Sequence, residues 1–180
     1  TTASNNTAVG YQAAYTNTTG AQNLTAGVLS LYANTTGSEN VAIGSGAVGV
    51  VVGALGSNTT GSYNTAIGNQ ALKSNTTASA NTAVGYQSLY INTTGDDNTA
   101  IGFNAVANTT TGNNNTGVGR DALLSNTTAS QNTAVGYQAG YSNLTGQNNV
   151  FIGDRTGQAT TSCCRMGMVI LGLGLIPPVL

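Results

Sequence analysis

The sequence has very few charged residues and lacks histidine and tryptophan altogether. Of its 180 residues, 4 are Lys or Arg and 5 are Asp or Glu, so charged side chains make up 5% and the formal net charge is -1. An ordinary globular domain has about 25% charged residues. Such scarce positive charge excludes the basic surface that nucleic acids and anionic membranes bind. Solubility must therefore come from Asn, Thr, Ser and Gln.

The same scarcity leaves no recognisable catalytic or metal site. General acid–base chemistry would depend on scattered carboxylates, namely Glu39, Asp96, Asp97, Asp121 and Asp154. The adjacent pair Asp96 and Asp97 offers too few oxygens for Ca²⁺, which takes six or more. No Lys-Ser or Lys-Thr follows the glycines in the way that a phosphate-binding loop requires. We therefore expect no enzyme activity, cofactor or metal.

Cysteine and long apolar runs are also scarce. Cys163 and Cys164 are adjacent, which is not a disulfide framework. The apolar stretch from Met166 to Leu180 has 15 residues, whereas a membrane-spanning helix needs about 20. For residues 160–180 we expect an end cap or an added strand in a neighbouring subunit. A membrane-associated or processed tail is the third interpretation.

Repetition is what the sequence has in abundance. Nine units begin with Asn, and they follow one another at intervals of 17 residues except for one interval of 24. Such a period indicates a solenoid or an array. The unit starts are Asn6, Asn23, Asn40, Asn64, Asn81, Asn98, Asn115, Asn132 and Asn149.

Each unit has the pattern of a short strand that ends at a glycine. The third residue after the Asn is apolar and often β-branched, and the fourth is always Gly, as in Val84 and Gly85. Seventeen residues are too few for a helical-hairpin repeat, which needs about 33, so the pattern favours strands. Stacked coils would place Val84 between Ile67 and Ile101 in an apolar ladder with a spacing of about 4.8 Å. The glycines are Gly10, Gly27, Gly44, Gly68, Gly85, Gly102, Gly119, Gly136 and Gly153.

A second, mostly apolar column lies eight residues after each Asn. It comprises Ala14, Leu31, Val48, Leu72, Leu89, Val106, Leu123, Gly140 and Gly157, and its last two glycines predict a thinning core. The 24-residue interval holds seven extra residues near 46–56, which form either a looped-out excursion or an additional part-coil. The unit-initial asparagines are expected to hydrogen-bond along the stack or to cap their own turns.

Asn-X-Thr sequences recur at the end of the units and have two interpretations. In a secreted eukaryotic protein they would be glycan acceptors, whereas Asn-Thr-Thr-Gly is also ordinary turn chemistry. We favour the turn. The candidate acceptors are Asn17, Asn34, Asn58, Asn75, Asn92, Asn108, Asn126 and Asn143, and Asn23 and Asn114 also qualify.

Two aromatic columns are candidates for surface contacts with a sugar or a neighbouring chain, although simple edge packing would also explain them. The first, five residues after the Asn, includes Tyr11, Tyr86, Phe103 and Tyr137, and the second includes Tyr15, Tyr32, Tyr90 and Tyr141. Regular Thr columns raise ice binding as an alternative function. Adjacent residues such as Thr93 and Thr94 would face opposite sides of a strand, and Thr82 supplies only a single column.

The units Asn-Thr-Ala-Val-Gly-Tyr-Gln and Asn-Val-Ala-Ile-Gly resemble repeats of two related groups. One is the head region of trimeric autotransporter adhesins, a left-handed parallel β-roll. The other, the closer match, is the repeat array of tail-fibre-domain proteins of phages and environmental bacteria. The resemblance covers roughly Asn6 to Gly157, and it implies a trimeric fibre that presents its surface to host cells.

We therefore predict an all-β parallel β-solenoid of 17-residue repeats. Residues 1–5 are expected to be the tail of a preceding repeat in a longer protein, residues 6–159 the nine-repeat solenoid, and residues 160–180 the cap or inter-subunit segment. The expected role is structural, in an extracellular, cell-surface or virion fibre. The expected partners are further copies, as a homotrimer or a head-to-tail filament, and a cell-surface receptor or glycan.

Overall fold

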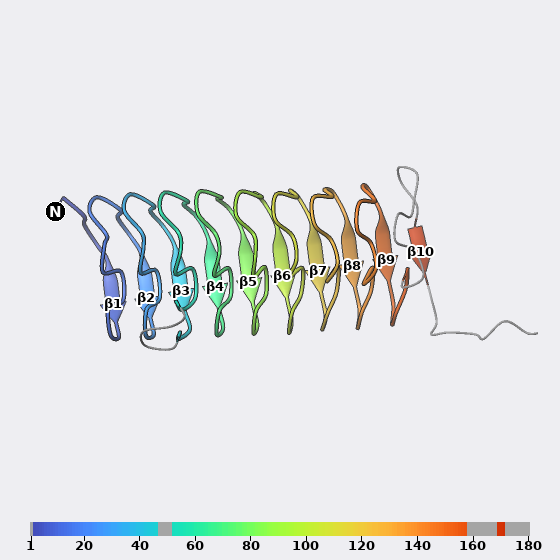
Figure 1. The fold of residues 1–180 in the computed structure, drawn as a ribbon, viewed down its shortest axis with the longest axis horizontal. Coiled ribbons are helices and arrows are strands. Elements are labelled where there is room, and N and C mark those ends of the chain that lie inside the picture. The colour runs from blue at the N-terminus through green and yellow to red at the C-terminus, as the bar shows by residue number, and fades with distance from the viewer. Residues whose placement is uncertain (1, 47–51, 158–168, 172–180) are drawn as a thin grey trace, which may run out of the picture.

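The chain forms a parallel β-solenoid, as the repeat predicts. The computed structural model describes residues 2–46, 52–157 and 169–171, and these ranges contain no helix. Ten strands of three residues form one parallel sheet in chain order (Figure 1). They are β1 (Thr7–Val9), β2 (Leu24–Ala26), β3 (Val41–Ile43), β4 (Thr65–Ile67), β5 (Thr82–Val84), β6 (Thr99–Ile101), β7 (Thr116–Val118), β8 (Thr133–Val135), β9 (Val150–Ile152) and β10 (Val169–Leu171).

Equivalent positions of successive units pair directly. In β5 and β6, Ala83 pairs with Ala100 and Val84 pairs with Ile101. The backbone ladder continues outside the sheet, where the amide of Leu89 donates to the carbonyl of Ala105 at 3.0 Å. Each coil is therefore bonded to the next on several sides, and stability is shared between neighbouring coils. The predicted ladder register is confirmed.

The glycine after each strand allows neighbouring coils to approach closely. Gly85 has a φ of +132°, and a Cβ at this position would lie 2.4 Å from the carbonyl oxygen of Gly102. A side chain there would clash with the backbone of the next coil, and a non-glycine residue would also be strained at this φ. The glycine is therefore required both by its positive φ and by the close approach of the next coil.

The 24-residue interval does not add a coil to the sheet. β3 pairs directly with β4, so that Ile43 lies beside Ile67. The amides of Gly46 and Gly53 donate to the consecutive carbonyls of Val28 and Leu29, so the chain returns to the ladder at Gly53, with six residues between the two glycines. Leu55 takes the core position that we assigned to Val48, and Val48 itself lies outside the described residues.

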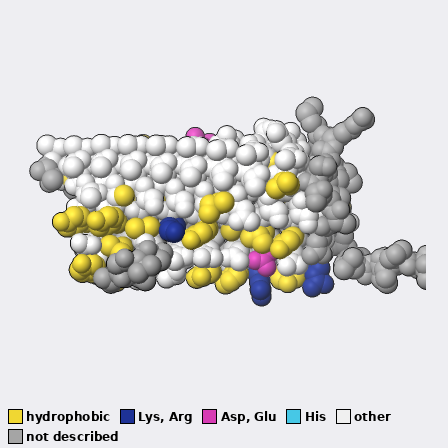
Figure 2. Space-filling model, viewed as in Figure 1, with side chains coloured by type: hydrophobic (Ala, Val, Ile, Leu, Met, Phe, Trp, Pro, Cys, Tyr) yellow, Lys and Arg dark blue, Asp and Glu magenta, His cyan; other side chains and the backbone are white. Residues whose placement is uncertain are grey.

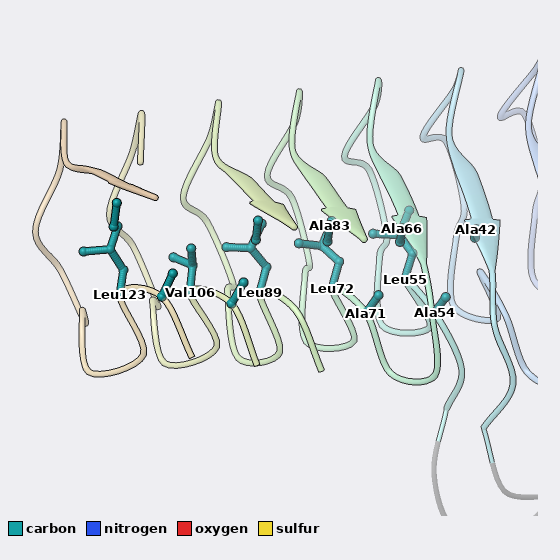
Figure 3. Close-up of a cluster of buried hydrophobic side chains, with 14 of the residues drawn as sticks. Ala42, Ala54, Leu55, Ala66, Ala71, Leu72, Ala83, Leu89, Val106 and Leu123 are labelled. Atoms are coloured by element: carbon teal, nitrogen blue, oxygen red, sulfur yellow. The ribbon is translucent and has the colours of Figure 1, made fainter. Parts of the chain in front are cut away.

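The core is a narrow row of alanines facing leucines (Figure 3). The middle residue is buried in every strand from β2 to β9, and Ala66 and Ala83 are fully buried, as are Leu72 and Leu89. The inward strand residue of one coil faces the residue that stands eight positions after the unit-initial Asn of the preceding coil. Gly117 shows this arrangement, because a Cβ added to it would lie 2.5 Å from Cγ2 of Val106. The interior therefore consists of pairs of side chains from neighbouring coils.

The core is filled at its C-terminal end by Phe151, which corrects the expectation of a thinning core at Gly140 and Gly157. A Cβ on Gly140 would lie 2.8 Å from Cδ2 of Phe151, and one on Gly157 would lie 2.4 Å from Cε1 of the same ring. Phe151 replaces the usual alanine and fills the space that the two glycines leave. The core stays filled because one large residue and two small ones share the same volume.

The apolar ladder that contains Val84 faces outward. Ile67, Ile101 and Val135 have 38%, 41% and 40% of their surface exposed. Strand residues alternate between the two faces, and the interior has room for alanine opposite leucine. The larger β-branched residues therefore form the outer column.

The apolar C-terminal stretch contributes three residues to the sheet. β10 pairs in parallel with β9, so that Val169 lies beside Val150 and Leu171 beside Ile152. These residues cover the edge of the ninth coil. The rest of the stretch lies outside the described residues.

Complementary pairing in the core predicts strong coupling between Val106 and Gly117. The single change Gly117→Ala should lower the free energy of unfolding by about 1–3 kcal/mol, because the new methyl group overlaps Val106. Adding Val106→Leu restores the Leu–Ala pair of the other coils and relieves a β-branched residue at a φ of 52°. The double variant should therefore recover most of the loss. Urea unfolding of the wild type, the two single variants and the double variant measures the coupling. Strictly additive changes in the free energy of unfolding would contradict the pairing.

Candidate functional site

The unit-initial asparagines form an internal ladder that closes each coil. The Asn81 Nδ2 donates to the carbonyl of Gly95 at 2.9 Å, which ties the start of the coil to its last turn. Its Oδ1 accepts the backbone amide of Asn98, also at 2.9 Å. This second bond recurs between all neighbouring unit-initial asparagines from Asn6 to Asn149. The expected hydrogen bonding along the stack is present, and it links side chain to backbone as well as amide to amide.

The turn asparagines form a second internal ladder. The Asn75 Nδ2 donates to the carbonyl of Ala78 at 2.9 Å, which holds the bend, and to the Asn58 Oδ1 at 2.8 Å. Asn34, Asn58, Asn75, Asn92, Asn126 and Asn143 are fully buried, and Asn17 is half-buried in the first coil. A glycan on the buried amides would require the coil to open. Asn108 is exposed because Thr109, not Asn108, takes the ladder position of its coil.

Thr109 interrupts this second ladder. Its hydroxyl donates to the carbonyl of Asn126 and accepts from the Asn126 Nδ2, so it offers nothing to the preceding coil. The Oδ1 of Asn92 is buried and has no hydrogen-bond partner among the described residues. An unsatisfied buried acceptor of this kind costs about 1–3 kcal/mol.

Completing the ladder should stabilise the protein. In Thr109→Asn, the new Nδ2 can donate to the Oδ1 of Asn92, as equivalent asparagines do in the four coils that end with Asn34, Asn58, Asn75 and Asn92. We expect a gain of about 1 kcal/mol, which corresponds to a rise in Tm of about 2–4 °C. Differential scanning calorimetry measures it.

The reverse change provides the matched control. Asn75→Thr copies the interruption in an intact part of the ladder and should lower Tm by at least as much. An unchanged or lower Tm for Thr109→Asn would contradict the role assigned to this ladder.

Two columns of outward residues cover the outer side of the sheet, and we call this surface the sheet face. The first strand residue is usually Thr and the third is usually Val or Ile. No charged residue occurs in either column, as the sequence shows. The third-residue column is Val9, Ala26, Ile43, Ile67, Val84, Ile101, Val118, Val135 and Ile152.

Aromatic and basic side chains form a continuous stack along another part of the surface. We call it the aromatic–arginine strip, and it consists of Tyr86, Phe103, Arg120, Tyr137 and Arg155. The rings of Tyr86 and Phe103 stack with centroids 5.1 Å apart. The Arg120 guanidinium lies 5.4 Å from the Phe103 ring and 6.0 Å from the Tyr137 ring, and that of Arg155 lies 5.4 Å from Tyr137.

Sequence reasoning found the aromatic members of the strip but missed the arginines. Arg120 occupies the aromatic column itself, so the 17-residue period would have placed it between Phe103 and Tyr137. Arg155 lies one position further along its unit. Tyr11, the other predicted contact residue, is exposed in the first coil and lies at the far end of the column. The second column contains a Tyr15–Tyr32 stack and a Lys73 that donates to the Tyr90 hydroxyl.

The threonine pairs lie in bends instead of strands, which corrects the reason we gave for separating them. Thr93 is half-buried, and its hydroxyl donates to the carbonyl of Thr110 at 3.0 Å. Thr94 is exposed. The first hydroxyl of each pair therefore serves the stack, and the second faces solvent.

The sides of the rod differ in chemistry. Hydrophobic and basic side chains gather in the lower part of the view in Figure 2, while its upper part is almost entirely neutral and polar.

Within the described ranges no three His, Cys, Asp or Glu residues gather as a metal site. The same part of the chain contains no apolar helix of membrane-spanning length.

No family model, curated protein or solved structure matches the chain. The fold and its surface columns define a β-solenoid repeat protein. Its candidate functional surfaces are therefore the sheet face and the aromatic–arginine strip.

Proposed function

We propose that the protein is a structural component of an extracellular fibre in which three copies pack through their sheet faces and present a repetitive surface for attachment. The observation that carries this proposal is the exposed Val and Ile column, which runs from Val9 to Ile152. The role proposed is mechanical and adhesive, without enzymatic chemistry. The trimer and the extracellular location draw their support from the resemblance to tail-fibre and adhesin repeats.

A parallel sheet with one bare apolar face is unusual. Parallel sheets occur almost only where both faces are covered. Among the described residues only the inner face has a covering, formed by Leu72, Leu89 and their equivalents. The column on the outer face is apolar, uncharged and repeated in every coil, with residues such as Ile43 and Ile152 exposed. Long apolar surfaces of this kind mark interaction sites.

A second copy of the same face is the natural complement. Each copy repeats its Val and Ile side chains at the coil spacing of about 4.8 Å, so identical ladders can interlock along their whole length. Closed symmetric assembly satisfies such faces without leaving one open. The remaining sides of each rod stay outside and carry the same columns many times, which favours multivalent attachment.

Light scattering during size-exclusion chromatography tests the assembly. The mass expected is three times the 17.9 kDa of one chain. The double variant Ile101→Lys with Val135→Lys places charges in the interface and should give a monomer with an unchanged far-UV circular dichroism spectrum. The control Thr94→Lys, in an exposed bend, should remain a trimer. A wild-type protein that is monomeric at micromolar concentration would contradict the proposal.

Ice binding is the second candidate, and one observation favours it. Five consecutive coils present half-buried Thr side chains in register beside the Val and Ile column, namely Thr65, Thr82, Thr99, Thr116 and Thr133. A flat, uncharged array of this kind suits a crystalline surface, and a trimer would bury it. Thermal hysteresis of the wild type, abolished in Thr99→Lys and retained in Thr94→Lys, would support ice binding over the trimer.

A further inference from the structure

We propose that the aromatic–arginine strip binds a linear polysaccharide that carries carboxylates. This inference deepens the proposed attachment role and rests on it, because it names the ligand class of that outer surface. It starts from the placement of the positive charges. All three cations among the described residues, Lys73, Arg120 and Arg155, lie against aromatic rings, and two of them belong to one stack.

The stack holds the guanidinium of Arg120 in a defined orientation while leaving it open to a ligand. Arg120 lies between Phe103 and Tyr137, and its Nε is 3.3 Å from Oδ2 of Asp121. The Asp121 side chain is 9% accessible while that of Arg120 is 63% accessible. The carboxylate therefore anchors one edge of the guanidinium from the protein side, and most of the cation faces solvent.

A fixed, stacked guanidinium suits a carboxylate ligand. Its planar fork donates parallel hydrogen bonds that match the two oxygens of a carboxylate. Because the aromatic rings limit the motion of the side chain, less conformational entropy is lost on binding than for a free arginine. Tyr and Arg side chains are also the residues that most often dominate binding energy at interfaces.

The spacing along the rod favours a polymer over a small anion. Arg120 and Arg155 belong to the seventh and ninth coils, which places them about 10 Å apart along the axis at the coil spacing. A linear polysaccharide with a carboxylate on alternate sugars repeats its charge over a similar distance. The exposed parts of Tyr86, Phe103 and Tyr137 supply apolar contacts for the sugar rings between the charges.

A nucleic acid fits the strip less well. Stacked aromatics and arginines also bind single strands, but such binding depends on neutralising several phosphates. Only 4 Lys and Arg residues occur in the whole chain. Asp154 is exposed beside Arg155 and would repel a densely charged backbone. A sparsely charged polysaccharide tolerates this carboxylate better.

Affinity electrophoresis in gels that contain hyaluronan tests the proposal, with dextran as the neutral polymer. The full chain should be retarded by hyaluronan and not by dextran, and the retardation should weaken as salt is added. Arg120→Gln and Arg155→Gln should each weaken binding about tenfold or more, because each removes a charge-assisted contact. Asp154→Asn should strengthen binding.

Lys73→Gln is the matched control, because it removes one positive charge beside an aromatic ring outside the strip. It should leave binding nearly unchanged. Equal losses for Lys73→Gln and Arg155→Gln would reduce the effect to net charge and overturn the proposal. Absence of retardation by hyaluronan, or preferential binding of single-stranded DNA, would overturn it as well.

Light scattering on the same samples separates this inference from the trimer. Hyaluronan binding by a monomeric protein would support the strip and refute the fibre assembly. A trimer that does not bind hyaluronan would support the fibre assembly and refute the role of the strip. Circular dichroism of each variant confirms that the coils are intact.

Discussion

The structure depends on the hydrogen bonds that hold each coil directly above the previous one. Backbone bonds join equivalent residues on several sides of the coil. The side chain of every unit-initial asparagine from Asn6 to Asn132 adds a bond to the next coil and another to its own last turn, as Asn81 does with Asn98 and Gly95. Buried amides are costly unless every donor and acceptor is satisfied. The two ladders satisfy most of them by repetition. The turn ladder is interrupted at Thr109 and again between Asn126 and Asn143, which leaves the Oδ1 atoms of Asn92 and Asn126 without a hydrogen-bond partner among the described residues.

Because the coils stack in strict register, equivalent residues of successive units lie side by side and form a column. The properties of the protein therefore depend on columns of residues and not on single ones. Inside, the strand residue of one coil packs against the residue that stands eight positions after the unit-initial Asn of the coil before it. Leu72 meets Ala83, Val106 meets Gly117, and Gly140 meets Phe151. Gly140 and Phe151 look unrelated along the chain, yet the large ring fills the space that the small residue leaves.

Outside, the same register creates surfaces that no single unit possesses. One exposed Ile is unremarkable on a protein surface, whereas the column from Val9 to Ile152 forms an apolar face that favours assembly. A lone Arg120 would be a mobile cation, but between Phe103 and Tyr137 it becomes an oriented one. The assembly surface and the attachment surface that we propose are both products of stacking.

The sequence by itself determined the coil, the parallel register and the position of the glycines, because period, β-branched residues and invariant Gly all indicate one backbone path. It also located the aromatic column. It did not determine which side of the strand faces inward, since Ala83 and Val84 are both apolar and a three-residue strand is too short to show an alternation. The tertiary structure decided this through volume, because the space opposite Leu72 and Leu89 admits alanine and turns valine and isoleucine outward. It also turned the Asn-Thr-Thr-Gly asparagines inward, because the closed coil needs their amides to hold its bends.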